Sequence, residues 1–416
     1  MKWTRMVAAA VASVMMAGMM TACGGSGGDG GSGPTLQSRS LPSKLEGSTI
    51  RVLAYDGWQE EHADIRQNLK DWYGVSVEYT VHNWQELKKK LSVDLAANIT
   101  YDMAPVGADL VLNKLCQPVT QYFDLSDPIF ADLKRISDSM TFGGELYGAP
   151  SVPNPEVIIY NKDLIENLGY DAPLKLFNEG KWNWDTFKSL ATSLCKEKTS
   201  GGEQITAFSS WDTRVLLTAN NTGFIRWQNE KYGLNLGDSK LRESLNYFKE
   251  LCTTGAFTSW QGWSGADFQL GNSAMIVDRF GNKTHFVSDL AFNWDFVPVP
   301  TGYSGGEDVT PGTVALYGFF FWFTISFCCS AYAYLFCKQD YERRKEYLAG
   351  YLTPEQVTRF EALYPKITRE YDIVGLDNTD QLIWDIADGA DVTSTLESYK
   401  TKWQSELDTY TAALPK

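Results

Sequence analysis

Apolar positions recur with two different spacings in the first part of the chain. A strand ending in a glycine turn is predicted over residues 49–58, two-residue alternation predicts another over residues 75–81, and a third apolar segment follows at residues 103–115. Between them, apolar residues three to four positions apart predict helices over residues 59–74 and 84–99. The apolar helix faces consist of Ile65, Leu69 and Trp72 in the first helix and Leu87, Leu91 and Leu95 in the second.

This alternation of strands and helices predicts a parallel sheet with right-handed crossover connections. In such sheets a ligand binds in the crevice at the carboxyl ends of the strands. The first and third predicted strands end at residues 55–58 and 106–109. We therefore expect ligand contacts there, and Asp56, Trp58 and Asp109 are the candidates.

The chain begins with the pattern of an export signal, in which basic residues precede an apolar stretch within residues 6–20. This stretch is too short for a stable membrane span. The sequence Met20-Thr21-Ala22-Cys23 resembles the lipobox of bacterial lipoproteins, in which the cysteine is diacylated and becomes the new N-terminus. Two acyl chains on Cys23 supply the dual anchoring that a single chain cannot. The alternative is an ordinary secretory signal with a chance cysteine.

A Gly/Ser-rich segment, residues 23–47, follows the predicted signal peptide of residues 1–22. It has almost no apolar side chains, so it cannot bury enough surface to order itself. We expect a flexible tether with a reach of roughly 25–30 Å. The body that follows is therefore predicted to be extracytoplasmic, anchored through its lipid to the outer face of the cytoplasmic membrane.

Composition excludes several classes of partner. The net charge of −14 argues against nucleic acid and anionic lipid. The three histidines are scattered and the cysteines show no metal-ligand spacing, so we expect neither a metal nor a cofactor. About 365 residues remain after the tether, which is natural for two lobes rather than one core.

Several short motifs follow one another along the rest of the chain. They are Tyr147-Gly148-Ala149-Pro150, Tyr160-Asn161-Lys162-Asp163-Leu164, Gly169-Tyr170-Asp171-Ala172-Pro173, Asn183-Trp184-Asp185-Thr186-Phe187, and residues 268–282, 294–302 and 389–410. In this order they resemble the family 1 extracellular solute-binding proteins of ABC importers, the group that includes maltose-binding protein. The similarity covers essentially all of residues 48–416. Within the second motif, Asp163 is expected to cap the helix that begins the second lobe.

The resemblance implies an α/β, two-lobed, periplasmic-binding-protein-like fold of type II. Each lobe is expected to be a mostly parallel sheet flanked by helices, with a hinge between the lobes. The implied N-terminal lobe comprises residues 48–153 plus 293–348, and the C-terminal lobe comprises residues 154–292 plus 349–416. The implied crossings between the lobes lie near residues 151–157 and 296–300. We expect a monomer whose protein partner is an ABC transporter permease.

One segment fits two interpretations, because residues 318–337 carry no charge and are long enough to cross a bilayer as a helix. Basic residues at positions 338 and 343–345 follow it, as expected at a cytoplasmic side. The resemblance instead implies a buried strand followed by a helix, and the aromatic content of the segment suits a strand. We therefore expect a buried strand and helix, with a membrane-spanning ligand sensor as the alternative.

No catalytic constellation stands out, so we expect a binding protein and not an enzyme. Residues 262–265 approach a nucleophile elbow but lack the second glycine at the right place. Asp267 and Asp278 are carboxylates of the kind that hydrolyse glycosides as a pair, which leaves a secreted carbohydrate-acting hydrolase as another alternative.

Aromatic residues beside Asp and Arg are what a sugar receptor needs, because a sugar presents both C–H faces and hydroxyl groups. Such residues occur on predicted loops at strand ends, where the resembling family lines its cleft. The candidate ligand-binding residues are Asp56, Trp58, Asp109, Trp211, Asp212, Trp263, Asp278, Arg279 and Tyr317. The predicted function is capture of a sugar or short oligosaccharide in an interlobe cleft and its delivery to the permease.

Overall fold

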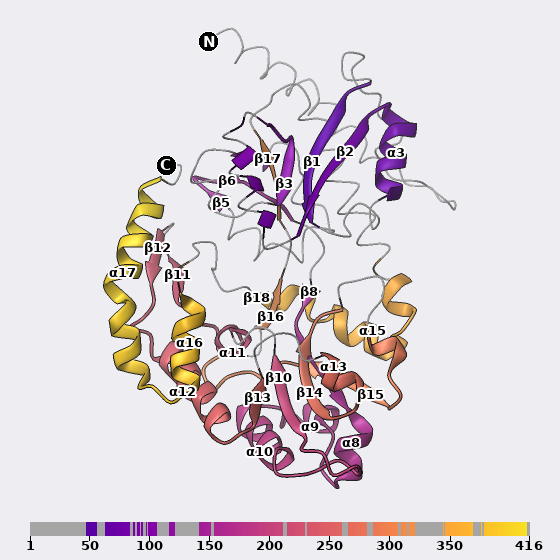
Figure 1. Cartoon of the computed structure of the whole chain (residues 1–416), viewed down its shortest axis with the longest axis vertical. Coiled ribbons are helices and arrows are strands. Elements are labelled where there is room, and N and C mark those ends of the chain that lie inside the picture. Colours follow the sequence, from indigo (N-terminus) through magenta and orange to yellow (C-terminus); the bar gives the residue numbers. More distant parts are fainter. Residues whose placement is uncertain are drawn as a thin grey trace, which may run out of the picture.

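The structure is a computed structural model in which most of the chain after the tether is described. The described residues are 47–55, 63–83, 86–87, 90–91, 93–94, 97, 99–105, 116–120, 141–150, 154–210, 214–228, 231–259, 265–280, 286–306, 309–313, 316–320, 344, 346–368, 376 and 378–413. Figure 1 shows that they form two lobes, one above the other.

The first lobe is built on a six-stranded sheet. Its strands β2, β1, β3, β17 and β4 are neighbours in that order, and β7 pairs with β17 as well. β1 is parallel to both β2 and β3, whereas β17 is antiparallel to β3, β4 and β7. The bounds are β1 Thr49–Tyr55, β2 Ser76–His82, β3 Met103–Pro105, β4 Cys116–Gln117, β7 Ala149–Pro150 and β17 Leu316–Phe320, with the separate hairpin β5 Thr141–Phe142 and β6 Glu145–Leu146.

Helix α3 (Ala63–Tyr73) packs Ile65 and Leu69 into the core of this lobe, as the spacing predicted. The aromatic residue that completes the buried face is Tyr73, because Trp72 lies one position around the helix and is half-buried. In the next predicted helix, Leu87 and Leu91 are buried and their residues are helical. Leu95 lies outside the described residues.

The second lobe is built on a five-stranded sheet in the order β13, β10, β14, β9, β15. β10 is parallel to β13 and β14, while β9 is antiparallel to both β14 and β15. β9 is buried along its whole length, as expected of a central strand covered on both faces. The bounds are β9 Val157–Asn161, β10 Thr206–Ser210, β13 Phe257–Ser259, β14 Ser273–Asp278 and β15 Trp294–Pro298.

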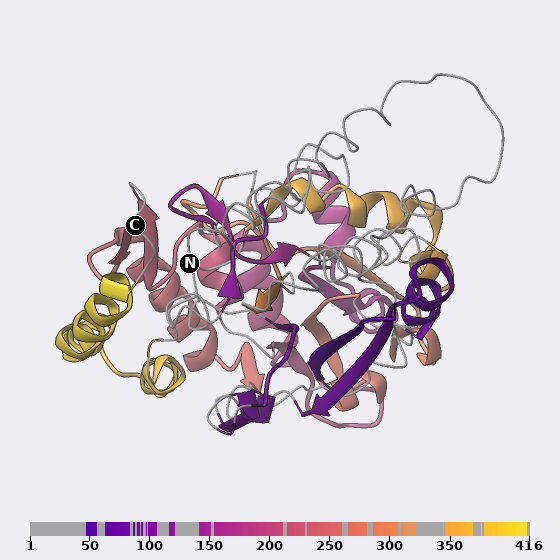
Figure 2. The ribbon, with the colours of Figure 1, turned by 90° about the horizontal axis from the view of Figure 1, so that it is seen from above.

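Helices surround the second sheet, and a hairpin of β11 and β12 packs beside the last helix, α17. Seen from above, α16 and α17 stand at one side of the molecule and α3 at the other (Figure 2). The bounds are α8 Lys162–Asn167, α9 Pro173–Asn178, α10 Trp184–Leu194, α11 Val215–Ala219, α12 Ser239–Thr253, α13 Gly265–Gln269, α15 Pro354–Glu361, α16 Thr379–Ala387 and α17 Val392–Ala413, the 3₁₀ helices η4 Phe286–Asp289 and η5 Tyr364–Lys366, and the hairpin strands β11 Ile225–Gln228 and β12 Lys231–Leu234.

A third sheet of three short strands lies between the lobes (Figure 1). It contains β8 (Asn154–Pro155), β16 (Thr310–Thr313) and β18 (Ile367–Thr368), with β16 in the middle. β8 lies in the chain between β7 of the first sheet and β9 of the second, and β16 lies between β15 of the second sheet and β17 of the first. Both of these connections between the lobes therefore pass through this sheet, and we call it the hinge sheet.

The pairing of β15 corrects one expected lobe boundary. The sequence assigned residues from 293 onward to the first lobe, but β15 is fully paired with β9, from Trp294 with Asn161 to Pro298 with Val157. Residues 294–298 are therefore part of the second sheet, and the chain crosses back only after Pro298. The sequence gives no sign of this, because a crossing segment and an edge strand have the same apolar pattern.

The start of α8 corrects a second expectation. Asn161, not Asp163, is the N-cap residue, and its side chain accepts a hydrogen bond from the Leu164 N–H. Asp163 lies in the first turn and instead accepts hydrogen bonds from the backbone N–H of Asn293 at 2.8 Å and from its side-chain amide at 3.0 Å. Asp163 thus ties the start of α8 to the residue before β15.

Replacing Asp163 by asparagine is expected to lower stability at pH 7 by about 1 kcal/mol, because an amide oxygen accepts hydrogen bonds less strongly than a carboxylate. The backbone and then the side chain of Asn293 lower the pKa of Asp163 below its ordinary value. A lowered pKa in the folded state means that the contribution is present above about pH 4 and is lost as pH falls through the folded-state pKa. Urea unfolding at pH 7 and pH 3 checks this. A difference between wild type and variant that does not shrink at pH 3 would contradict the role of the charge.

The apolar segment of residues 318–337 begins in the first sheet. Gly318, Phe319 and Phe320 belong to β17 and are paired with β3 and β4, which confirms the strand that was expected at its start. Residues 321–337, including the expected helix, lie outside the described residues. Within the part of the chain that is described, no helix combines the length and apolarity needed to cross a membrane.

Candidate ligand-binding cleft

The parallel strands of the first sheet end together at one edge. β1 and β2 end at the same level, since Tyr55 is paired with His82. β17 runs in the opposite direction, so its first residues lie at this edge, where Tyr317 is paired with Pro105 of β3 and with Ala149 of β7. The edge that carries the carboxyl ends of β1 and β3 is therefore also the edge at which β7 departs and β17 arrives.

The strands of the second sheet show the same arrangement. β14 and β15 end at the same level, because Asp278 and Pro298 are both paired with Val157, the first residue of β9. β10 ends beside them, with Ser210 paired with Val277. At this edge β9 arrives and β15 departs, so the carboxyl ends of three strands lie where the chain enters and leaves the lobe.

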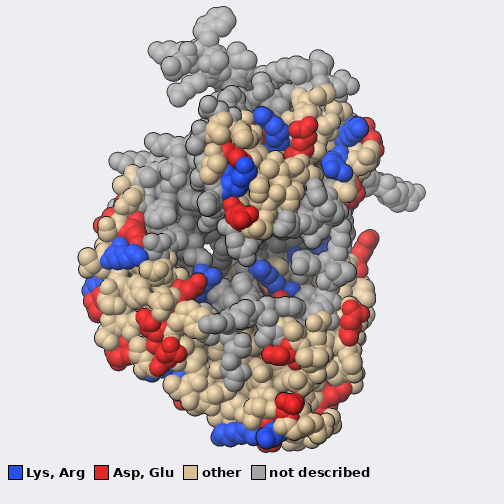
Figure 3. All heavy atoms as spheres, in the orientation of Figure 1, with Lys and Arg blue, Asp and Glu red and all other residues tan. Residues whose placement is uncertain are grey.

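Both connections through the hinge sheet therefore run between the edge of the first sheet at which its parallel strands end and the corresponding edge of the second sheet. The edges of the two sheets face each other across the hinge sheet, and the space between them is the position at which open α/β sheets bind ligands. Figure 3 shows that the surface is hollowed between the two lobes and that atoms of Lys or Arg are visible there. We call this hollow the interlobe cleft.

The structure describes three of the nine predicted site residues. Asp278 is the last residue of β14 and Arg279 follows it, both at the cleft edge of the second sheet. The backbone of Tyr317 lies at the cleft edge of the first sheet. The other six lie outside the described residues, and each follows the end of a described strand: Asp56 and Trp58 after β1, Asp109 after β3, Trp211 and Asp212 after β10, and Trp263 after β13.

Asp278 and Arg279 place opposite charges next to each other at this edge. Both side chains are half-buried, and the Arg279 backbone N–H donates to Asp278 Oδ1 at 2.7 Å. A carboxylate accepts hydrogen bonds from hydroxyl groups, while a guanidinium donates to hydroxyl and ring oxygens. This pair can therefore recognise a neutral polyhydroxylated solute from one side.

The sequence pattern missed several polar residues at the cleft edge and in the hinge sheet. Ser209 and Ser210 end β10 and are fully buried, and Glu156 is buried where its backbone N–H donates to the Pro311 carbonyl at 2.9 Å. The position of Ser210 directly before Trp211 was the one available signal. No sequence signal indicated Glu156, because its location between β8 and β9 depends on the pairing of β8 with β16.

Tyr147 is a buried residue of the first lobe, two residues before β7. Burial, followed by the nearby Glu145 and Cys116, raises the pKa of Tyr147 above its ordinary value. Its hydroxyl group therefore stays protonated at neutral pH and keeps its capacity to donate a hydrogen bond.

Gly312 allows the strands of the hinge sheet to approach closely. A Cβ atom at this position would lie 2.8 Å from Ile367 Cγ2, 3.0 Å from the Asn154 carbonyl oxygen and 3.2 Å from Pro155 Cα. Two of these atoms are backbone, so they cannot move aside without separating β16 from β8.

Replacing Gly312 by valine is expected to destabilise the protein by about 1–3 kcal/mol, because the added atoms overpack the contact between β16 and its neighbours. Gly237→Ala is the matched control, since a Cβ at Gly237 would meet nothing within 4 Å. Thermal unfolding of both variants checks this. Equal melting temperatures for the two would mean that the hinge strands are not held as closely as described.

The described residues show no other arrangement with evident chemistry. Among them, no three His, Cys, Asp or Glu residues are placed to hold a metal ion, and Cys116, Cys195 and Cys252 form no disulfide bond. A cavity of about 570 Å³ lies on the flank of the edge strand β2, lined in part by Arg51, Arg66 and Glu78. None of the three described site residues lines it, and the interlobe cleft, where the strand ends lie, is the candidate ligand site.

Residues 45–321 match the sequence model of a family described as bacterial extracellular solute-binding protein. A curated protein of Brucella abortus is 27% identical over 135 residues, so that the match spans 31% of this chain and only 30% of that protein. An uncharacterized lipoprotein from the oleD 5′ region of Streptomyces antibioticus is 23% identical over 302 residues, 68% of this chain and 62% of its own length.

A solved structure shows the same fold. It is the ABC substrate-binding protein of Listeria monocytogenes in complex with cycloalternan, which superposes with a TM-score of 0.68 at 15% sequence identity. The superposition covers 87% of this chain and 99% of that protein. The agreement over nearly the whole length confirms the predicted two-lobed α/β architecture.

Proposed function

The chain belongs to the bacterial extracellular solute-binding protein family, and from this premise we propose that it captures a sugar or short oligosaccharide in the interlobe cleft and delivers it to an ABC transporter permease. The observation that carries the proposal is the pair of carboxyl-end edges that face each other across the hinge sheet. A solute between them contacts both lobes. It therefore favours the closed arrangement by its differential affinity for that state.

Three further points support a carbohydrate rather than another solute. The Asp278 and Arg279 pair suits hydroxyl groups, and Trp58, Trp211 and Trp263 follow strand ends at the cleft edges. The Listeria protein of the same fold was solved with a cyclic oligosaccharide. The proposed site consists of Asp56, Trp58, Asp109, Trp211, Asp212, Trp263, Asp278, Arg279 and Tyr317.

Thermal unfolding of residues 48–416 in the presence of single sugars tests the proposal. A ligand at a concentration of 100 times its Kd adds about 2.7 kcal/mol of stability, which raises the melting temperature by about 5 °C in a protein with lobes of this size. Maltose, maltopentaose, cycloalternan and lacto-N-biose form the panel, with sodium glutamate as a non-carbohydrate control. No shift with any sugar would overturn the carbohydrate assignment, and release of free monosaccharide from the panel would indicate a hydrolase instead.

The proposed lobe assignment follows the sheets. Residues 48–153 and the part of the chain from β17 onward to residue 348 form the first lobe, and residues 154–298 with residues 349–416 form the second, apart from the hinge strands. The proposed signal peptide of residues 1–22 and tether of residues 23–47 precede them.

Membership of an extracellular family places the protein outside the cytoplasm. We assign its attachment to Cys23, because that cysteine closes the lipobox-like sequence and because the Streptomyces relative is a lipoprotein. The Gly/Ser tether then lets the two lobes move above the outer face of the cytoplasmic membrane.

Replacing Cys23 by serine is expected to abolish membrane retention, because the side chain that receives the acyl chains is gone. The wild-type chain expressed in a bacterium should sediment with membranes, and the variant should appear as soluble or unprocessed protein. Membrane fractionation with an immunoblot measures both. A processed Cys23→Ser chain that still sediments with membranes would overturn the lipid anchor and favour insertion of residues 318–337.

A further inference from the structure

Arg344 is a half-buried cation at the junction of the hinge sheet and the second lobe. Its Nη2 donates to the Asn154 side-chain oxygen at 2.9 Å and to the Phe280 carbonyl oxygen at 2.6 Å. These acceptors belong to different parts of the fold, since Asn154 opens β8 of the hinge sheet and Phe280 follows the end of β14. One guanidinium group therefore connects the hinge sheet to the cleft edge of the second sheet.

If the protein binds its solute in the interlobe cleft, this connection links the binding site to the hinge sheet, and the following inference rests on that proposed function. We infer that Arg344 is a positioning residue that couples the ligand-contacting end of β14 to the hinge strand β8. Arg344 hydrogen-bonds Phe280, the residue after Arg279, so it acts on the ligand through the residues it holds.

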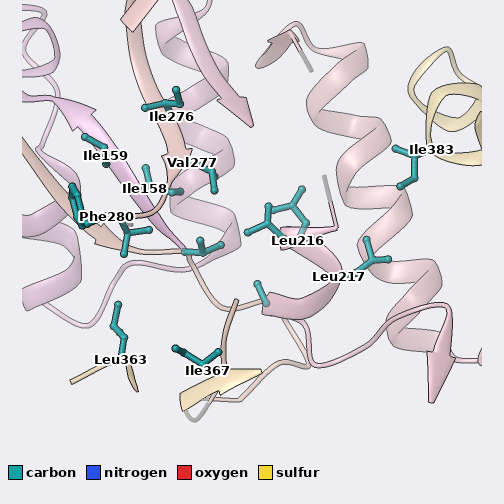
Figure 4. Close-up of a cluster of buried hydrophobic side chains, with 14 of the residues drawn as sticks. Ile158, Ile159, Leu216, Leu217, Ile276, Val277, Phe280, Leu363, Ile367 and Ile383 are labelled. Atoms are coloured by element: carbon teal, nitrogen blue, oxygen red, sulfur yellow. The ribbon is translucent and has the colours of Figure 1, made fainter. Parts of the chain in front are cut away.

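Phe280, the residue after Arg279, is fixed both by the packing of its ring and by the hydrogen bond to its carbonyl oxygen. The Phe280 ring is fully buried and packs against Phe296 at 5.2 Å, Phe360 at 5.3 Å and Tyr351 at 5.8 Å between ring centroids. In Figure 4, Phe280 lies at one side of the cluster formed with Ile158 and Val277. Tyr351 follows the helical residues that contain Arg344, so the same segment fixes both the ring and the carbonyl group of Phe280.

Asn154, the acceptor in the hinge sheet, is also fixed in position. Asn154 is paired with Thr313 of β16, and the close approach at Gly312 prevents β8 from shifting sideways within the hinge sheet. A rotation of the lobes that moves β8 therefore moves the Asn154 side chain relative to Arg344. The planar guanidinium group has a rigid donor geometry, so it cannot follow both acceptors at once.

A second donor of Arg344 makes a change in this contact costly. Its Nε–H is shielded from water and has no hydrogen-bond partner, so the two hydrogen bonds of Nη2 are the contacts that hold this side of the guanidinium group. Leaving a further shielded N–H donor without an acceptor is unfavourable. Ordering of Asp278 and Arg279 by a ligand thus favours the position of β8 at which both hydrogen bonds are formed.

Amide hydrogen exchange of the unliganded protein tests the coupling directly. In Arg344→Met, the amides of Glu156 beside the hinge and of Arg279 at the cleft edge are both expected to exchange at least about tenfold faster, since the group that holds both segments is gone. The Asn220 amide, which donates to Leu216 within α11, serves as the internal reference and should not change. Arg242→Met is the matched control, because Arg242 also donates to a carbonyl group, that of Gly237, but on the exposed surface.

A double-mutant cycle separates coupling from local loosening. Asn154→Ala removes only the acceptor in the hinge sheet, yet it is expected to accelerate exchange of the Arg279 amide through Arg344. In the Arg344→Met background, the same Asn154→Ala change should have no further effect on Arg279. The inference would be overturned if the two substitutions accelerated exchange of the Arg279 amide independently, or if Asn154→Ala left that exchange rate unchanged. Arg344→Lys keeps the charge and replaces Arg344→Met if that variant does not fold.

A ligand experiment distinguishes this inference from the proposed function. With whichever of maltose, cycloalternan and lacto-N-biose stabilises the wild type, Arg344→Met should bind about tenfold more weakly and show a smaller ligand-induced decrease in the radius of gyration by small-angle scattering. Unchanged affinity and closure would overturn the inference while leaving the receptor intact. If neither these three sugars nor maltopentaose binds the wild type, the proposed function fails, and the exchange cycle still decides whether Arg344 couples the two segments.

Discussion

Replacing Trp403 by alanine is expected to lower the free energy of unfolding by about 3–5 kcal/mol, the usual cost of removing a large buried aromatic side chain. Trp403 lies in the long C-terminal helix α17 and is completely buried. Its ring contacts Phe224, which precedes β11, at 5.3 Å, and Tyr399 of the same helix at 5.0 Å. The indole therefore joins α17 to the core of the second lobe, and its loss leaves a cavity between them.

Urea unfolding followed by circular dichroism measures this effect. Trp72→Ala is the matched control, because Trp72 is half-buried at the edge of the first core and should lose less than Trp403. A loss below about 1 kcal/mol at Trp403 would mean that α17 is not part of the cooperative core of the second lobe. That result would also remove the assignment of residues 349–416 to this lobe.

Local patterns were sufficient for much of the fold. Helical spacing predicted α3, and α10 begins at the Asn183-Trp184-Asp185-Thr186 motif, where Asn183 and Thr186 form a capping box. Each of these features depends on residues close together in the chain. The parallel direction of β1, β2 and β3 followed from the alternation of strands and helices for the same reason.

Other features depend on contacts between distant residues, and the sequence did not reveal them. The assignment of β15 to the second sheet requires its pairing with β9, and the hinge sheet requires β8, β16 and β18 to meet from three separate parts of the chain. Asp163 was expected to be a cap, but its oxygens bind Asn293, which is distant in sequence. A propensity at one position cannot show which distant group that position will contact.

The candidate site, too, was only partly predictable from local sequence patterns. The rule that ligands bind at the carboxyl ends of parallel strands led to the edges of the two sheets that border the interlobe cleft. It did not indicate Glu156 or Arg344, because neither residue lies at the end of a predicted parallel strand. Which of the nine proposed residues contact the solute is a question for mutagenesis, and the tryptophans have the largest expected effect.

Replacing Trp211 or Trp263 by alanine is expected to weaken sugar binding by roughly 5- to 150-fold. Stacking of a sugar face on an indole that is buried by the ligand should contribute on the order of 1–3 kcal/mol, and each 1.4 kcal/mol is about a tenfold change in Kd. Trp211 directly follows Ser210 of β10, and Trp263 follows β13, at the edge of the second sheet that faces the cleft. We propose for this reason that both indoles contact the solute.

The same placement predicts little change in the unliganded protein. A side chain that faces an open, hydrated cleft supports little of the core, so the melting temperature without ligand should stay close to that of the wild type. Isothermal titration calorimetry with a sugar that stabilises the wild type, together with thermal unfolding of the free variants, gives both quantities. Trp403→Ala should show the opposite pattern, with a large loss of stability and nearly unchanged intrinsic affinity. If Trp211→Ala and Trp263→Ala behave like Trp403→Ala, these tryptophans are packing residues and the solute binds elsewhere along the two facing edges.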